Sequence, residues 1–199
     1  GFMLNGCPVK LKGTNLHQDH AGVGTGIPDR LWEYRIKKMK TIGSNAIRTS
    51  HNPMSPVFLD LCDRLGMLVI EENRLMGINR EHIGLLEHMI KRDRNHPCII
   101  LWSIGNEEWA LEGNERGLRI TKSMSEYVHQ LDSTRLSTQG TAGGRVSLFG
   151  VDVKGYNYLR QNPIDEFHQK HPEWYSPVGS EETSGCGTRN VYYTDSLRG

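Results

Sequence analysis

Two glutamates occupy comparable places in this sequence. Glu107 ends Gly105-Asn106-Glu107 after the apolar run 99–102, and Glu181 ends Gly179-Ser180-Glu181 after the run 177–178. Short apolar runs of this kind indicate buried strands. Two carboxyl groups at the ends of parallel strands can face each other across a pocket, and such a pair can cleave a glycosidic bond. One carboxyl group then gives a proton, and the other attacks or stabilises the sugar.

Each of these glutamates has a glutamate neighbour that competes for the same role. Glu108 follows Glu107, and Glu182 follows Glu181. Because neighbouring side chains near a strand end point to opposite faces, we expect one member of each pair to enter the pocket. The competing interpretation is that each glutamate is a solvated loop carboxylate. The position at a strand end favours a place in the candidate site over this alternative.

Other polar and aromatic side chains directly follow the predicted strands and complete the candidate site. Asn106 can hydrogen-bond a sugar hydroxyl, and a guanidinium such as that of Arg48 holds a nearby carboxylate ionised. The phenol of Tyr158 could donate to the attacking carboxylate, or the ring could serve as aromatic packing. Trp109 could form a platform for a sugar ring, whereas we expect Trp102 to belong to the core.

The histidines leave more than one interpretation open. His51 either contacts substrate or braces the loop at Asn52-Pro53, since a lone histidine is an unspecific signal. His17, Asp19 and His20 are residue types that bind metals. An extended H-x-x-H segment, however, sends its two rings to opposite sides, so we expect no metal site there.

The elements that must position these side chains alternate between strands and helices. Helical periodicity and end signals predict helices over residues 29–42, 55–66, 81–92, 114–131 and 165–169. Short apolar runs predict strands over residues 12–15, 45–48, 67–70, 99–103, 136–138, 151–153 and 177–180. Asn5-Gly6 predicts a small N-terminal hairpin. The fold class is therefore α/β, and seven strand–helix units favour a TIM (β/α)8 barrel over an open sheet.

The composition of the chain excludes several other classes of function. The 199 residues suit one domain, and the formal net charge of +1 gives no field that would attract nucleic acid or a membrane surface. No apolar stretch approaches the roughly 18 residues of a membrane-spanning helix. The four cysteines form no C-x-x-C pair, and the glycine-rich loop 21–26 lacks the G-x-G-x-x-G order. We therefore expect no zinc framework, no nucleotide site and no cofactor.

Several segments carry a family resemblance, in the same order along the chain. They are residues 12–17 (KGTNLH), 45–53 (NAIRTSHNP), 61–66 (LCDRLG), 92–97 (RDRNHP) and 102–107 (WSIGNE). In these segments the chain resembles the catalytic barrel of glycoside hydrolase family two, the group of β-galactosidases, β-glucuronidases and β-mannosidases. The amino-acid sequence around residues 17–20 and 73–76 is most similar to that of β-galactosidases from Bacteroides-type bacteria.

The resemblance implies a retaining double displacement with Glu107 as acid/base and Glu181 as nucleophile, and with the two carboxyl groups about 5–5.5 Å apart. It further implies that the sugar subsite or the nucleophile is supported by Asn106, His17, Arg48, His51 and Tyr158. Some members hold magnesium through an E-x-H step after the third strand. Here that stretch reads Glu71-Glu72-Asn73-Arg74, so we carry over no metal.

We therefore expect residues 1–199 to form a C-terminally truncated catalytic barrel from a larger multidomain enzyme. The eighth strand and the β-sandwich domains that usually precede the barrel are expected elsewhere in that polypeptide. The expected function is exo-acting hydrolysis of terminal β-galactosides. The alternatives are a β-glucuronidase, a β-mannosidase, a metal-dependent barrel hydrolase and an inactive carbohydrate-binding domain. The expected partners are an oligosaccharide or glycoside substrate and the sandwich domains, with homo-oligomerisation left open and no nucleic acid or membrane.

Overall fold

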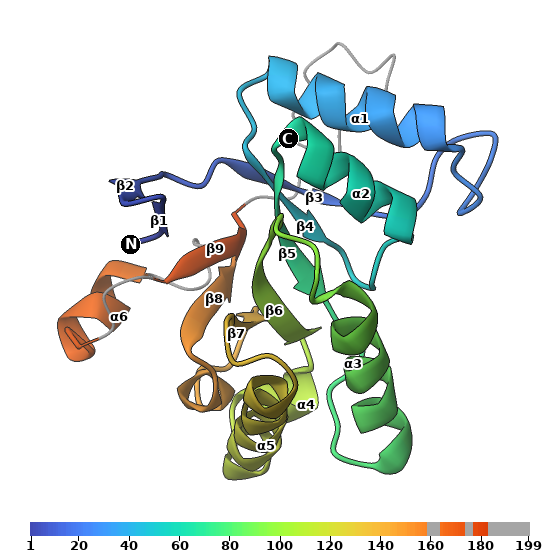
Figure 1. The fold of residues 1–199 in the computed structure, drawn as a ribbon. Coiled ribbons are helices and arrows are strands. Elements are labelled where there is room, and N and C mark those ends of the chain that lie inside the picture. Colours follow the sequence, from blue (N-terminus) through green and yellow to red (C-terminus); the bar gives the residue numbers. More distant parts are fainter. Residues whose placement is uncertain (159–163, 174–176, 183–199) are drawn as a thin grey trace, which may run out of the picture.

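The structure, a computed structural model, describes residues 1–158, 164–173 and 177–182 (Figure 1). Its strands are β1 (Met3–Leu4), β2 (Cys7–Pro8), β3 (Gly13–Leu16), β4 (Ala46–Thr49), β5 (Leu68–Glu72), β6 (Ile99–Asn106), β7 (Leu136–Thr141), β8 (Val153–Asn157) and β9 (Val178–Glu181). Its helices are α1 (Asp29–Thr41), α2 (Pro56–Leu65), α3 (Arg80–Asp93), α4 (Trp109–Glu112), α5 (Glu115–Leu131), the 3-10 helix η1 (Ser147–Gly150) and α6 (Ile164–Lys170).

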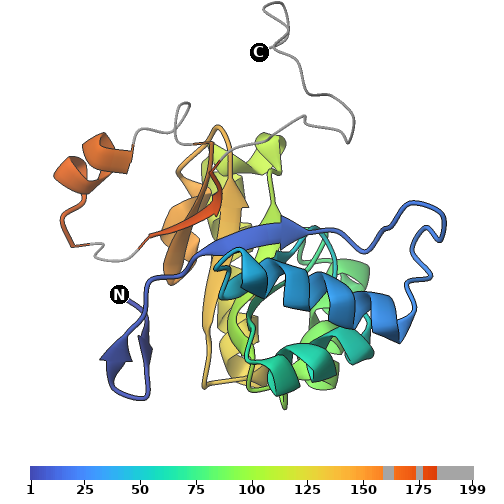
Figure 2. The ribbon, with the colours of Figure 1, turned by 90° about the horizontal axis from the view of Figure 1, so that it is seen from above.

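Strands β3 to β9 form one parallel sheet in chain order. The sheet curves, and helices cover its outer side (Figures 1 and 2). The curvature brings distant strands together, because Nη1 of Arg48 on β4 lies 2.7 Å from Oε1 of Glu181 on β9. The predicted barrel of the TIM type, with seven of its strands in the described chain, is confirmed. The predicted N-terminal hairpin is also confirmed, as the antiparallel pair β1–β2.

The limits of α2 follow from its end residues. Pro56 occupies the first turn, where its missing N–H costs no hydrogen bond. Gly66 ends the helix with φ of 66°, a left-handed conformation that glycine adopts without steric cost. Ser55 is the N-cap residue, but its side chain makes no capping hydrogen bond. Its N–H instead donates to Oε1 of Gln18 at 3.0 Å, so the loop after β3 holds the start of the helix.

Large aromatic side chains fill the layer between the sheet and the helices. Trp32 of α1 packs edge to face on Phe58 of α2, with ring centroids 5.1 Å apart. Trp102 is fully buried and donates its indole N–H to Oδ2 of Asp132 at 2.9 Å, which confirms its expected place in the core. Buried aromatic rings with satisfied polar atoms are strongly stabilising, so the strands that end at the candidate site are firmly held.

The largest differences from the predicted elements occur in the second half of the barrel. Strands β7 and β8 reach Thr141 and Asn157, beyond the predicted ranges 136–138 and 151–153. Both added ends contain buried polar residues, including Gln139, Thr141 and Asn157, which an apolar pattern does not mark as strand. Helices α4 and η1 were not predicted, because a single helical turn is too short to show periodicity.

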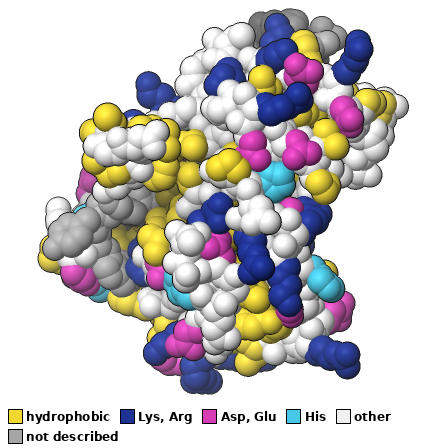
Figure 3. Space-filling view, in the orientation of Figure 1, with side chains coloured by type: hydrophobic (Ala, Val, Ile, Leu, Met, Phe, Trp, Pro, Cys, Tyr) yellow, Lys and Arg dark blue, Asp and Glu magenta, His cyan; other side chains and the backbone are white. Residues whose placement is uncertain are grey.

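The face drawn in Figure 3 carries positive and negative side chains in a mixed pattern, which agrees with the net charge of +1. Hydrophobic side chains gather there over the N-terminal hairpin (Figure 3), where Met3 and Leu4 are exposed. Within the described residues, every helix is too short or too polar to cross a membrane.

Candidate active site

Glu181 ends β9 and is held by donors from two other strands. Its Oε1 accepts from Nη1 of Arg48 at 2.7 Å, and its Oε2 accepts from the hydroxyl of Tyr158 at 2.8 Å. The side chain is 11% exposed, so solvent or a ligand can reach it. A carboxylate that accepts from a guanidinium and a phenol keeps a fixed orientation, because hydrogen bonds from a charged donor are strong.

Arg48 is the central cation of this site. It is 4% exposed on β4, and its Nε donates to Oε2 of Glu72 at 2.8 Å. Its Nη2 donates to Oδ1 of Asn106 at 2.6 Å. One guanidinium therefore connects the ends of β4, β5, β6 and β9, which is possible because its donors form a rigid planar fork.

Glu72, on the neighbouring strand β5, holds Arg48 in place and is fully buried. Burial alone raises the pKa of Glu72, but the charge of Arg48 and the hydrogen bonds from His51 and Ser103 outweigh it and keep the pKa below its ordinary value. Oγ of Ser103 donates to Oε2 of Glu72 at 2.7 Å. The buried charge is therefore paired and hydrogen-bonded, as a buried carboxylate must be.

Glu107 follows β6 directly and has an unusual backbone. Its φ is 48°, a left-handed conformation that costs a non-glycine residue on the order of 1–3 kcal/mol and tends to occur at functional sites. Nδ2 of Asn157 donates to Oε1 of Glu107 at 2.7 Å and to Oδ1 of Asn106 at 3.0 Å. The backbone N–H of Glu107 donates to the carbonyl of Gly140 on β7 at 3.0 Å.

The two glutamates consequently belong to one hydrogen-bonded network that runs through Asn157, Asn106 and Arg48. Gly140 lies directly beneath it. A Cβ atom at this position would lie 2.7 Å from Oδ1 of Asn106 and 2.9 Å from Nη2 of Arg48. Only a residue without a side chain leaves these two groups in contact.

Of the two histidines predicted for the site, His51 lies beside Glu181 and His17 lies behind His51. His51 places Nδ1 at 2.6 Å from Oε1 of Glu72 and Nε2 at 3.6 Å from Oε1 of Glu181. The ring of His17 meets the ring of His51 edge-on, with centroids 5.3 Å apart, and His17 is exposed. His51 therefore braces its loop against Glu72, and its other nitrogen faces Glu181.

Trp109 lies two residues after Glu107, at the start of α4. Its side chain is 75% exposed, so it does not serve the core in the way that Trp102 does. The structure thus brings Asn106, Arg48, His51 and Tyr158 into direct contact with the two glutamates or with their partners, while His17 and Trp109 lie at the periphery.

Comparison with known proteins decides the family. A family model described as glycosyl hydrolases family 2, TIM barrel domain, matches residues 1–181. The chain belongs to glycosyl hydrolase family 2. The family resemblance drawn from the sequence is thereby confirmed.

The relatives of this family 2 domain are named for different activities. A β-galactosidase of Bacteroides ovatus is 35% identical over 100% of this chain and 29% of the relative. A β-glucuronidase of Sus scrofa is 35% identical over 91% of this chain and 28% of the relative. The crystal structure of a family 2 member from Bacteroides cellulosilyticus has a TM-score of 0.82 and 39% identity, covering 92% of this chain and 26% of that chain. The chain thus spans less than a third of each of these relatives.

Metal ligation was considered for His17, Asp19 and His20. In the part of the chain that the structure describes, the side chains close enough to form a three-ligand group are those of Asp60, Asp63 and His96, and the His17 segment forms no such group. Within that group Asp63 already accepts from the N–H of Cys98 at 2.8 Å and lies 2.7 Å from Nδ1 of His96. These bonds join α2 to the start of β6, which is a structural role.

Two residues of the candidate site are not among those that the sequence predicts. Asn157 donates to Glu107 and accepts from Oγ of Ser180 at 2.7 Å, and Glu72 holds both Arg48 and His51. Asn157 could have been found from its place at the end of a parallel strand, beside the strand that ends in Glu181. Glu72 could not be singled out from the sequence, because nothing in the pair Glu71-Glu72 tells which member points inward.

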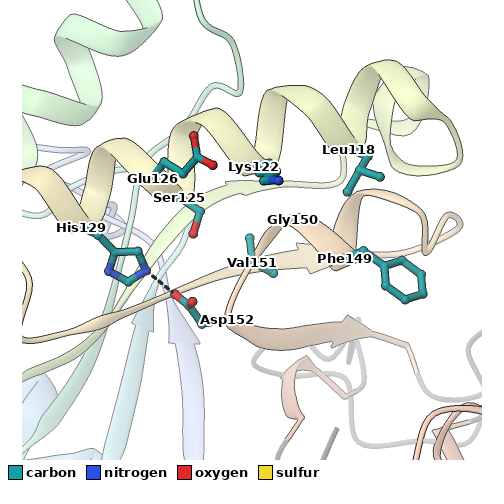
Figure 4. A pocket seen from close by; sticks show the side chains of 9 residues that line it. All are labelled: Leu118, Lys122, Ser125, Glu126, His129, Phe149, Gly150, Val151 and Asp152. Carbon is teal, nitrogen blue, oxygen red and sulfur yellow. Dashed lines mark hydrogen bonds and ion pairs between the residues drawn. The ribbon is translucent and has the colours of Figure 1, made fainter. Parts of the chain in front are cut away.

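A hollow of about 420 Å³ lies elsewhere, between α5 and residues 149–152 (Figure 4). The ring of His129 points toward Asp152 there, with Nε2 at 2.9 Å from Oδ2. Asp152 directly precedes β8, so this hollow is at the amino-terminal end of that strand. Barrel chemistry takes place at the opposite ends of the strands, and we therefore assign the hollow no part in it.

The hydroxyl of Tyr158 supplies one of the two donors to Glu181, and its removal is the mildest test of the site. Tyr158→Phe is expected to lower kcat/KM for a nitrophenyl glycoside by about 10- to 100-fold, because a hydrogen bond to a charged group is worth about 1.5–3 kcal/mol. Steady-state kinetics measure this effect. Tyr34→Phe on the exposed face of α1 is the matched control. A loss of less than about twofold in Tyr158→Phe would contradict the assigned contact.

Proposed function

We propose that this chain is the catalytic barrel of an exo-acting retaining β-glycosidase that hydrolyses terminal β-galactosides. Glu107 is the proposed acid/base and Glu181 the proposed nucleophile. The observation that carries the proposal is the network in which Asn157 holds Glu107 while Arg48 and Tyr158 hold Glu181. Two carboxyl groups positioned by neighbouring donors are what a double displacement requires.

In the first step of this mechanism, a carboxylate oxygen of Glu181 attacks the anomeric carbon. The bond from that carbon to the glycosidic oxygen breaks, and the proton of Glu107 passes to this oxygen, so that the aglycone leaves as an alcohol. In the second step Glu107, now a carboxylate, takes a proton from water. The water oxygen displaces Glu181 from the sugar, and the configuration at the anomeric carbon is retained.

The environment of each glutamate supports this division of roles. Both oxygens of Glu181 accept, one from a guanidinium and one from a phenol, and these donors hold the carboxylate in a fixed orientation, as a nucleophile requires. One oxygen of Glu107 accepts from the amide of Asn157, which holds the carboxyl group beside the rest of the network. The left-handed backbone of Glu107 agrees with a residue held in position for chemistry.

The hydrogen-bond partners of Arg48 favour a neutral sugar over a uronic acid as the substrate. This guanidinium already pairs with Glu72 and Glu181 and donates to Asn106. Its Nη1 also lies 3.4 Å from the carbonyl oxygen of Ser180, and its Nη2 lies 2.5 Å from Oε2 of Glu72. All five N–H groups of the guanidinium therefore have partners within the site, and none is left for the carboxylate of a glucuronate. Relatives named β-galactosidase at 35% and 40% identity support galactose, while β-glucuronidase is the second candidate because relatives at 34% and 35% identity carry that name.

A panel of nitrophenyl β-galactoside, β-glucuronide, β-mannoside and β-glucoside, assayed with the complete polypeptide, tests the sugar. We expect kcat/KM to be highest for the galactoside, by about 10²-fold or more over the others, because a site that hydrogen-bonds one hydroxyl arrangement leaves polar groups unpaired with another. Activity is expected to survive a chelator. A glucuronide preference would move the assignment to the second candidate, and a loss of activity that zinc restores would favour a metal-dependent hydrolase.

The chain is proposed to act within a longer polypeptide that also supplies β-sandwich domains and the eighth strand. This rests on the lengths of the relatives, of which the chain spans 29% or less in the pairs compared above. An incomplete barrel lacks one wall of its pocket. All kinetic experiments here are therefore designed for the complete polypeptide.

A further inference from the structure

Strand β5 carries two adjacent carboxyl groups that point to opposite sides of the sheet. Glu72 points into the barrel and holds Arg48 and His51. Glu71 is also fully buried, but it faces outward, toward α2 and α3, because successive side chains of a strand alternate. A buried carboxyl group with no place in the proposed mechanism requires an explanation.

Glu71 binds the backbone of the loop between β4 and α2. Its Oε1 accepts from the N–H of Met54 at 3.2 Å. The backbone carbonyl of Met54 accepts from Nη2 of Arg92 on α3 at 2.7 Å. Arg92 is in turn oriented by Asp93, through bonds of 2.6 and 2.7 Å. Both backbone polar groups of Met54 are therefore held from behind the sheet.

The loop that contains Met54 also contains His51, which presents Nε2 to Glu181 at 3.6 Å. Glu72 holds this loop at Nδ1 of His51 on the inner side of the sheet. Glu71 holds it three residues further along, on the outer side. The two neighbouring glutamates of β5 thus hold one loop at two points, and the position of His51 depends on both.

We propose that Glu71 is a positioning residue of the candidate active site, whose carboxyl group fixes the β4–α2 loop through Met54 and thereby sets His51 against Glu181. The inference rests on the proposed function for its kinetic consequence, but not for its structural one. Glu71 touches no substrate in this account and acts through the loop.

The protonation state of Glu71 determines how firmly it can hold the loop. Burial raises the pKa of Glu71 to about 8, and the charge of Asp93 adds to this, while the Met54 N–H and Arg92 oppose it. The thiols of Cys62 and Cys98 also face it, and burial raises the pKa of each. Oε2 of Glu71 has no hydrogen-bond partner within the described chain. At neutral pH Glu71 is therefore an uncharged acid with Oε1 as its acceptor.

Glutamine is the closest copy of this uncharged acid, because its amide oxygen can accept the same N–H and it does not titrate. Alanine removes the contact. Ionisation of Glu71 as the pH rises through about 8 makes Oε1 a stronger acceptor of the Met54 N–H, but it also places a negative charge beside Asp93, which orients Arg92 on the Met54 carbonyl. We expect the repulsion of Asp93 to displace Arg92 and thereby the loop. Three variants of the complete polypeptide follow: Glu71→Gln, Glu71→Ala and, as a control on the exposed face of α5, Glu126→Gln.

Stability as a function of pH tests the buried acid without any assay of activity. The unfolded chain releases the proton of Glu71 near its ordinary pKa of 4.5 and the folded chain near 8, so the wild type loses stability as the pH rises between these values. Glu71→Gln lacks this loss. Its Tm advantage over wild type should grow from about pH 5 to about pH 8 and then level off, whereas Glu126→Gln should show no such trend.

Two further measurements test positioning itself. In hydrogen exchange, a peptide over residues 50–55 should exchange faster in Glu71→Ala than in wild type or Glu71→Gln, with α5 unchanged. In kinetics, a dinitrophenyl glycoside needs no proton from Glu107, so a decline of its kcat/KM above about pH 8 reports the loop. Glu71→Gln should keep kcat/KM within about threefold of wild type at about pH 6 and lack this decline.

Unchanged exchange in Glu71→Ala, or an alkaline decline in Glu71→Gln equal to that of wild type, overturns the positioning role. If Glu71→Ala does not fold, the comparison of Glu71→Gln with wild type still decides through the two pH profiles. If the wild type hydrolyses no glycoside, the proposed function fails. The exchange and Tm experiments then still decide whether Glu71 holds the loop.

Discussion

Glu181→Gln is expected to lower kcat for an aryl β-galactoside by about 10⁴-fold or more in the complete polypeptide. An amide cannot form the ester bond of the glycosyl-enzyme, and removal of a nucleophile typically costs this much. The amide oxygen can still accept from Arg48 at the position of Oε1, and the amide NH2 at the position of Oε2 can donate to the Tyr158 hydroxyl, whose oxygen can also accept. The loss is therefore expected in turnover, while substrate binding changes little.

The matched control for this variant is Glu182→Gln, one residue further along and exposed. Near-normal turnover is expected there, because this side chain has no bond to Arg48 or Tyr158 among the contacts of the described residues. A thermal melt of both variants separates loss of chemistry from loss of folding. Near-normal turnover in Glu181→Gln, or a large loss in Glu182→Gln instead, would show that the nucleophile has been assigned to the wrong residue.

The barrel itself was predictable from the sequence because its signals are local. Residues 68–70 and 99–102 are apolar runs, and α1 repeats Trp32 and Ile36 at helical spacing, with both buried. Alternation of such units leaves few topologies other than a parallel sheet. The boundaries were less predictable where strands end in polar residues, as at Thr141 and Asn157, because buried polar side chains do not appear in an apolar pattern.

The contact between the two glutamate segments was predictable for a different reason. Parallel strands present their carboxyl ends at one edge, so residues that end β6 and β9 must lie on the same side of the barrel. Arg48 and Asn106 were predictable on the same ground, whereas the contact that Asn157 makes with Glu107 depends on register. Asn157 meets Glu181 only through a register shift between β8 and β9, and no local pattern encodes this shift.

Glu71 illustrates the limit of sequence reasoning most clearly. In the sequence Glu71 and Glu72 are equivalent members of a pair at a strand end. In the fold one is a paired anion beneath the candidate site and the other an uncharged acid behind it. The difference arises from which side of β5 carries Arg48 and which carries Asp93, and that is a property of the packed structure alone.

Glu107→Gln is expected to produce a loss that depends on the leaving group. For a substrate with a poor leaving group, such as a methyl β-galactoside, kcat/KM should fall by about 10²–10⁴-fold, the usual contribution of a general acid. For a dinitrophenyl β-galactoside the fall should stay within about tenfold, because this leaving group departs without a proton. Kinetics with both substrates on the same preparation measure the difference.

The control for this variant is Glu108→Gln, which alters the neighbouring glutamate of the sequence. It should leave the ratio of kcat/KM for the two substrates close to that of wild type. Glutamine at position 107 can still accept from Nδ2 of Asn157, so the backbone conformation and the network to Arg48 are expected to persist. A changed ratio in Glu107→Gln then reports the lost proton and not a displaced site.

Comparison of the two glutamate variants separates their roles more sharply than either does alone. Loss of the nucleophile removes the covalent intermediate whatever the aglycone, so Glu181→Gln should be inactive on both substrates. Loss of the acid removes only the proton, so Glu107→Gln should discriminate between them. Equal losses on both substrates in Glu107→Gln would contradict the acid role. The general acid would then have to be sought at another carboxyl group near the end of β6, with Glu108 as the first to test.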